Sequence, residues 1–133
     1  MGDLFTAIIL GHLVGDYVLQ NDWMALNKVK WNDEGWLAAF VHCICYSTAV
    51  TTSLLLCGFK HIGYANTFEL IWLVTFMSHF PIDKVSLAKY WMRFYGHSTD
   101  VTKNPFTPLV YVVIDNTMHL IIMMVAFSKL LVK

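Results

Sequence analysis

Four apolar segments, separated by polar connections, dominate the pattern of hydrophobic and polar positions along the chain. They cover about residues 4–24, 35–57, 67–83 and 107–132. A helix that crosses a membrane needs about 20 predominantly apolar residues. We therefore expect one all-α domain over residues 1–133, an integral membrane bundle of four transmembrane helices.

An amphipathic stretch at about residues 84–96 follows the third apolar segment. It combines basic residues with Trp91, Phe94 and Tyr95. Aromatic rings of this kind gather at the boundary between membrane and water, and basic amphipathic helices lie in that plane. We expect an interfacial helix here, with membrane lipid as a partner.

The composition agrees with a membrane protein. The chain is 57% hydrophobic and 14% charged, whereas soluble domains carry about 25% charged residues. The formal net charge is zero, without a basic stripe, which excludes nucleic acid as the expected partner. The three cysteines lie in one apolar segment without a CxxC pair, so no disulfide framework is expected.

The distribution of basic residues predicts the orientation, because cytoplasmic loops are enriched in Lys and Arg. With four spans, three lysines share the side of the two termini: Lys60, Lys129 and Lys133. Six basic residues lie on the other side: Lys28, Lys30, Lys84, Lys89, Arg93 and Lys103. We therefore expect both termini outside the cytoplasm.

Each apolar segment also contains histidine, and three of the four pair it with aspartate at a spacing of four residues. The pairs are His12 with Asp16, His79 with Asp83, and Asp115 with His119, and the second segment supplies His42. Residues four apart share one face of a helix. In a four-span bundle all seven fall in the half of the membrane nearest the first and third connections. We therefore expect them to converge.

Such a cluster predicts a metal site. An ionisable residue inside a membrane costs roughly 2.5–3.5 kcal/mol and needs compensation. Imidazole and carboxylate bind zinc, manganese and iron, so all seven residues are candidate ligands, enough for one divalent transition metal or two.

An aspartate not committed to metal (Asp16, Asp83 or Asp115) would act as a general base. Such a site would clamp a phosphate or ester oxygen and activate water, which favours a hydrolase of a lipid-linked or membrane-accessible phosphate or ester.

Four further polar side chains lie beside the predicted ligands. Lys28 and Lys84 would bind an anionic substrate group, or extend to the interface with their charged ends. Gln20 and Asn116 would orient the ligands, or pair across helices. Because little of the chain would lie outside the membrane, a homo-oligomer is also expected, with small residues where helices approach closely: Ala7, Gly11 and Gly15.

Two other functions fit the same residues. In one, the His and Asp residues only hold the bundle together, and the chain is a non-enzymatic phage or bacterial membrane protein that binds or perturbs a host membrane protein. In the other, the cluster conducts protons or ions. Bound metal distinguishes the hydrolase from both alternatives.

The motifs themselves resemble a known family. The pattern HxxGDxxLQxxxMAxxK runs from His12 to Lys28, and HxxxD and DNxxH follow in the third and fourth segments. This combination is similar to a small uncharacterised family of bacterial and phage proteins, classed as a domain of unknown function. The resemblance implies a multi-pass protein of the bacterial inner membrane. It is also similar in pattern to predicted membrane-bound metal-dependent hydrolases.

Overall fold

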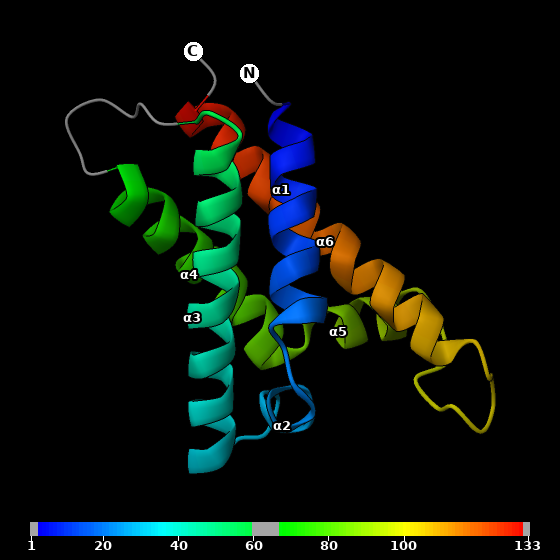
Figure 1. The fold of residues 1–133 in the computed structure, drawn as a ribbon. Coiled ribbons are helices and arrows are strands. Elements are labelled where there is room, and N and C mark those ends of the chain that lie inside the picture. Colours follow the sequence, from blue (N-terminus) through cyan, green and yellow to red (C-terminus); the bar gives the residue numbers. More distant parts are fainter. Residues whose placement is uncertain (1–2, 60–66, 132–133) are drawn as a thin grey trace.

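The computed structural model describes residues 3–59 and 67–131. Within them the chain is all-α, as predicted, and six α-helices and one π-helix follow one another along it. Figure 1 shows their arrangement, with α1 and α3 side by side in front of the inclined helices α4 and α6. Lys60 and Lys133, which entered the prediction of orientation, lie outside the described residues.

The first apolar segment is not one helix, and the prediction of a helix over 4–24 is wrong beyond Val18. Helix α1 (Leu4–Leu13) continues into a π-helix, η1 (Val14–Val18), which closes with a hydrogen bond of 2.9 Å from Leu19 N to Val14 O. A separate helix, α2 (Asp22–Asn27), begins after Asn21. The Asn21 side chain accepts from Met24 N while its own backbone is extended, so a capping residue starts a new helix here.

Helix α3 (Asp33–Leu56) packs closely against α1, as the small residues predict. The Asn32 side chain caps its first turn by accepting from Gly35 N. A Cβ atom on Gly11 would lie 2.6 Å from Val50 Cα, and one on Gly15 would lie 2.6 Å from Tyr46 Cδ2. Both glycines are therefore required by the contact between these helices.

The third apolar segment forms α4 (Thr67–Val85), which is longer than the predicted 67–83 and includes Pro81. Ser86 follows its last residue and has a left-handed backbone with φ of 53°. The amphipathic helix α5 (Leu87–Phe94) follows. Its buried side consists of Ala88 and Met92, whereas its aromatic side chains are exposed: Tyr90, Trp91 and Phe94.

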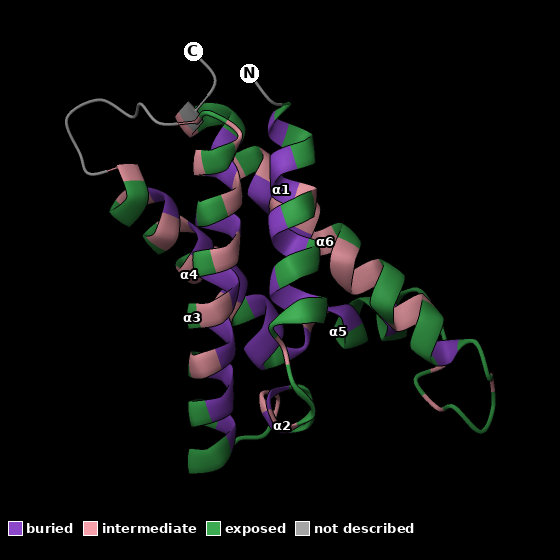
Figure 2. Cartoon of the chain, in the orientation of Figure 1, coloured by how far each residue is buried: buried purple, intermediate pink, exposed green. Residues whose placement is uncertain are grey.

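Helix α6 (Thr107–Leu131) contributes a narrow face to the core. His119, Met123 and Phe127, each four residues from the next, are buried, and most of the remaining helix is half-buried or exposed (Figure 2). The apolar core lies between α1, α3, α4 and α6 and includes these residues: Leu4, Ala7, Ile8, Tyr46, Val50, Leu54, Ile71, Met123 and Phe127.

Two described helices, α3 and α6, are long and apolar enough to cross a membrane, where the sequence predicted four. The apolar helix at Leu4–Val18 is too short because the chain leaves helical geometry before Asn21. Helix α4 carries Glu69, Asp83 and Lys84 within its 19 residues. The start of α1 and the ends of α3 and α6 lie at one end of the molecule, at the top of Figure 1.

Candidate metal centre

Five histidine and aspartate side chains from four elements meet in the interior. Asp16 comes from η1, His42 from α3, His79 and Asp83 from α4, and His119 from α6. All five are buried, with exposed fractions of 9% or less. They form two groups of candidate metal ligands: Asp16 with His42 and His79, and His79 with Asp83 and His119. The predicted convergence of the helices is thus confirmed for these residues.

Within each group the candidate ligand atoms lie close enough for one ion. His42 Nε2 lies 3.0 Å from both His79 Nε2 and Asp83 Oδ2, and His79 Nε2 lies 3.2 Å from Asp83 Oδ2. Asp16 Oδ1 lies 3.3 Å from His42 Nε2 and 3.9 Å from His79 Nε2. Tetrahedral ligands at zinc distances are about 3.3–3.6 Å apart. One ion could be held by the three residues of either group, with His79 common to both.

Hydrogen bonding alone does not satisfy this set of atoms. Both His42 and His79 direct Nε2 at the same carboxylate oxygen of Asp83, and their Nδ1 atoms are buried without a hydrogen-bond partner among the described residues. Asp16 Oδ1 is buried and has no hydrogen-bond partner among the described residues. Buried polar atoms without partners are costly, so the arrangement favours a bound cation.

His119 is oriented as a ligand by its own helix. Its Nδ1 lies 2.9 Å from the carbonyl oxygen of Asp115, which can only accept a hydrogen bond, so Nδ1 carries the proton. The lone pair of Nε2 is then left facing Asp83 Oδ1 at 3.2 Å. Only a cation between these two acceptors, a metal ion or a proton, makes the contact favourable. Metal-binding histidines commonly donate their other N–H to a carbonyl in this way.

The π-helix brings Asp16 to the centre. Its wider turn spans Val14–Val18, and Asp16 Oδ2 still lies 3.4 Å from His12 Nδ1 in the preceding turn. Gly15 allows this turn to lie against Tyr46 of α3. Single π-helical turns occur frequently at functional sites, because they redirect one side chain within a helix.

His12, predicted as a ligand, belongs to neither ligand group among the described residues. Its Nε2 lies 2.9 Å from Asn116 Oδ1 and therefore donates, and its Nδ1 lies 2.8 Å from the hydroxyl of Tyr46. Asn116 Nδ2 donates in turn to the Tyr17 hydroxyl at 2.6 Å. The structure thus places His12 and Asn116 in a hydrogen-bonded layer beside the ligands.

Tyr46 is a member of the site that the sequence analysis missed. Its ring stacks on His79 with centroids 3.5 Å apart, and its hydroxyl contacts His12 and Met123. The side chain is fully buried. Its position four residues after His42, on the same face of α3, was the available signal.

Lys28 contacts the centre directly. Its ammonium donates to Asp83 Oδ2 at 2.5 Å and to Gln20 Oε1 at 2.8 Å, and lies 3.3 Å from His42 Nε2. Burial lowers the pKa of Lys28, but the charges of Asp83 and Asp16 outweigh it and the pKa is raised. Lys28 therefore stays protonated, and Gln20 helps to orient it.

Lys84 has a different position from the one predicted, away from the ligands. Its ammonium donates to the carbonyl of Lys30 at 2.6 Å and to that of Lys28 at 3.3 Å. It also lies 4.2 Å from the ring centroid of Trp36. Lys84 thus holds the connection between α2 and α3 against α4, and its ammonium is occupied by these two carbonyls and the Trp36 ring.

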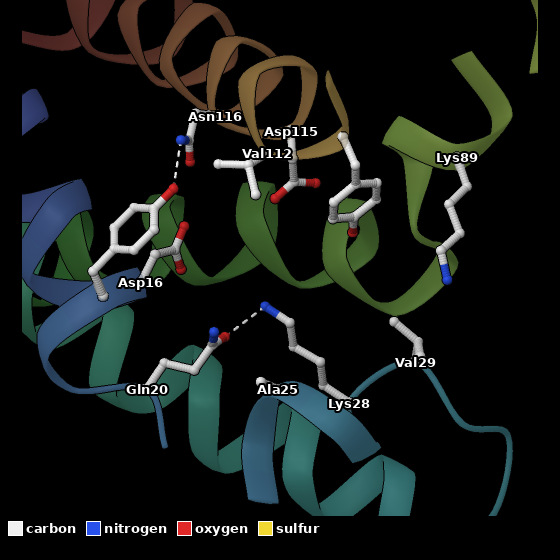
Figure 3. Close-up of a pocket in the computed structure, with 11 residues that line it drawn as sticks. Asp16, Gln20, Ala25, Lys28, Val29, Lys89, Val112, Asp115 and Asn116 are labelled. Atoms are coloured by element: carbon white, nitrogen blue, oxygen red, sulfur yellow. Dashed lines mark hydrogen bonds between the residues drawn. The ribbon is translucent and has the colours of Figure 1, made fainter. Parts of the chain in front are cut away.

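A cavity of about 260 Å³ opens beside the cluster, between η1, α2, α5 and α6. Figure 3 shows Asp16 and Lys89 towards opposite ends of it, with the Lys28 ammonium between them. Asp115 lies on its wall, outside both ligand groups, and its Oδ1 has no hydrogen-bond partner in the described part of the chain. A small polar molecule could therefore approach the candidate ligands from this side.

No curated protein and no solved structure matches this sequence. The expected membership of an uncharacterised family is confirmed, because residues 4–133 match the family described as protein of unknown function DUF3307, to which this chain therefore belongs.

Proposed function

We propose that this chain is an integral membrane protein that binds a divalent transition metal and uses it to hydrolyse a lipid-linked or membrane-accessible phosphate or ester. The observation that carries the proposal is the two buried ligand groups that share His79: Asp16 with His42 and His79, and His79 with Asp83 and His119. Nitrogen and carboxylate ligands at this spacing suit zinc, and manganese or iron with additional ligands.

Charge favours one ion. The three carboxylates of Asp16, Asp83 and Asp115 face one ammonium, that of Lys28, which leaves a formal charge of −2 with neutral imidazoles. One divalent ion balances this charge in a buried site. The two ligand groups also share His79, which further supports a single ion, with His119 completing or adjusting its coordination.

The exposed surface of α6 supports a location in the membrane. This helix is apolar enough to span, yet only 11% of its most apolar stretch is buried within the molecule. The core helix of a soluble protein would be covered, whereas lipid would cover this one. We propose that α3 and α6 cross the bacterial inner membrane and that α1, η1 and α4 pack along them, with both termini outside the cytoplasm.

The residues around the cavity suit hydrolysis. A bound divalent metal would polarise the phosphoryl or ester oxygen and make water more acidic. Asp115, a carboxylate that is not a candidate ligand, is placed to accept the proton of the attacking water. Lys28, already paired with Asp83, would hold that carboxylate in place beside the metal.

Metal analysis of the purified protein in detergent tests this proposal. We expect one equivalent of metal in the unchanged protein, and its loss in His79→Ala and in Asp83→Asn. Asp115→Asn should keep the metal and lose hydrolysis of a chromogenic phosphate or ester. Metal-free protein after purification without chelators, and after incubation with zinc, manganese or iron, would overturn the proposal and favour a structural cluster.

The structure supports a proton or ion conductor less well than a metal-dependent hydrolase. The hydrogen-bonded series from Tyr17 through Asn116 and His12 reaches Tyr46 and ends at the sulfur of Met123. Beyond it lies the apolar core around Ile8 and Phe127. A proton path would need polar groups on that side.

A further inference from the structure

Lys89 is a cation on the cavity wall that the proposed chemistry leaves without a role. It lies on α5, its side chain is exposed, and it has no ion pair or side-chain hydrogen bond with the residues described here. It borders both the cavity beside the cluster and a neighbouring cavity of about 220 Å³. A cation in this place is available to a ligand.

The other nearby cations are not available in the same way. The ammonium of Lys84 is held by two backbone carbonyls and a tryptophan ring. That of Lys28 is paired with Asp83. Lys89 is therefore the cavity's one lysine without such a partner in the described ranges, 3–59 and 67–131.

The charge of the loaded site indicates what Lys89 would bind. One divalent ion neutralises the three carboxylates and Lys28, so Lys89 adds a positive charge at the far end of the cavity. The wall also carries groups that can donate hydrogen bonds, from Gln20 and Tyr111. Cations combined with such donors suit a phosphate group.

The position of α5 indicates where this phosphate comes from. Trp91 and Phe94 of the same helix are exposed, next to a face that carries Lys89 and Arg93. A short helix with basic and aromatic residues on its surface fits the boundary of a membrane, where lipid phosphates lie. A phosphate held by Lys89 would then be at head-group depth.

We infer that the cavity between η1, α2, α5 and α6 binds a phosphate group, with Lys89 as the residue that recognises it at the entrance. This inference rests on the proposed function, since it names the substrate class of the same site. It excludes neutral esters as the preferred ligands.

Native mass spectrometry of the metal-loaded protein in detergent tests the inference. The ligands are phosphatidic acid, diacylglycerol with the same chains, and soluble glycerol phosphate. The variants are Lys89→Met, the conservative Lys89→Arg, and Arg93→Met, which removes the same charge from an exposed position on the same helix. We expect Lys89→Met to weaken phosphatidic acid binding about tenfold, as loss of a charged hydrogen bond does. Lys89→Arg and Arg93→Met should change it less than about twofold.

The comparisons between ligands and variants decide the outcome. Diacylglycerol binding as tightly as phosphatidic acid, or equal weakening by Lys89→Met and Arg93→Met, would overturn the inference. Competition by glycerol phosphate would assign a soluble source, and its absence a lipid source, both consistent with a phosphate site. Metal is measured in the same samples. Lys89-dependent binding without metal would refute the proposed function alone, whereas bound metal without Lys89 dependence would refute this inference alone.

Discussion

At the scale of single residues, the centre separates side chains that would hold a metal from side chains that hold those ligands in place. His79 belongs to both groups of candidate ligands, whereas both ring nitrogens of His12 are engaged with Tyr46 and Asn116. The two histidines look alike in the sequence because each begins an i, i+4 pair. Their expected responses to substitution differ.

We expect His12→Ala to keep the metal and lower stability, and His79→Ala to lose the metal. Removing His12 leaves the Asn116 carbonyl oxygen without its donor and the Tyr46 hydroxyl with only the Met123 sulfur, at a cost of about 1–3 kcal/mol. Metal content and the thermal midpoint in detergent, measured on both variants, check this. Loss of metal from both at equal stability would make His12 a ligand.

Lys84 makes a second prediction at this scale. Lys84→Met should loosen the connection between α2 and α3, because the carbonyls of Lys28 and Lys30 lose their donor. Hydrogen exchange should rise at residues 28–31 while the metal content stays near that of the unchanged protein. Lys103→Met, an exposed charge between α5 and α6, is the control and should leave exchange there unchanged. Equal exchange in both variants would contradict the prediction.

At the scale of elements, the close contact of α1 and η1 with α3 holds the centre together. Gly15→Ala would place Cβ 2.6 Å from Tyr46 Cδ2, and Tyr46 stacks on the His79 ring. We expect a loss of about 1–3 kcal/mol of stability, typical of overpacking, and weaker metal binding. Chemical denaturation and metal titration measure the two effects.

Leu13→Ala is the matched control for this contact. Leu13 ends α1, two residues before Gly15, and its side chain is 44% exposed. Its truncation should leave metal affinity unchanged. If Gly15→Ala bound metal as tightly as Leu13→Ala, the contact between η1 and α3 would not position the ligands.

The sequence predicts most of the helices. Long apolar runs predict α3 and α6 within a few residues, because nothing inside them competes with the helix. The prediction for the first segment fails because the π-helix and the Asn21 cap interrupt the helix that was expected to continue to residue 24. The same break moves Gln20 off the predicted stripe and towards Lys28.

For the site, the sequence predicts which residues converge but not the role of each one. Spacing predicts that His and Asp residues converge, since three i, i+4 pairs on three helices and His42 on a fourth are expected to face one interior. It does not distinguish His12 from His79, because that depends on which atoms of neighbouring helices reach each ring. Lys89 lies on an exposed amphipathic helix whose docking no local pattern reveals.

At the scale of the whole molecule, the exposed apolar surface of α6 offers a test of whether the protein lies in a membrane. Ile121 lies midway along this helix and is 57% exposed. In water, arginine at such a position would change stability little. In a membrane it would cost roughly 2.5–3.5 kcal/mol. We therefore expect Ile121→Arg to reduce the fraction that resists alkaline extraction from membranes. Tyr90→Arg, on the exposed side of α5, should leave that fraction unchanged, because an interfacial position tolerates arginine. Normal expression of a soluble, folded Ile121→Arg protein would instead place α6 in water and remove the basis for a membrane-embedded site.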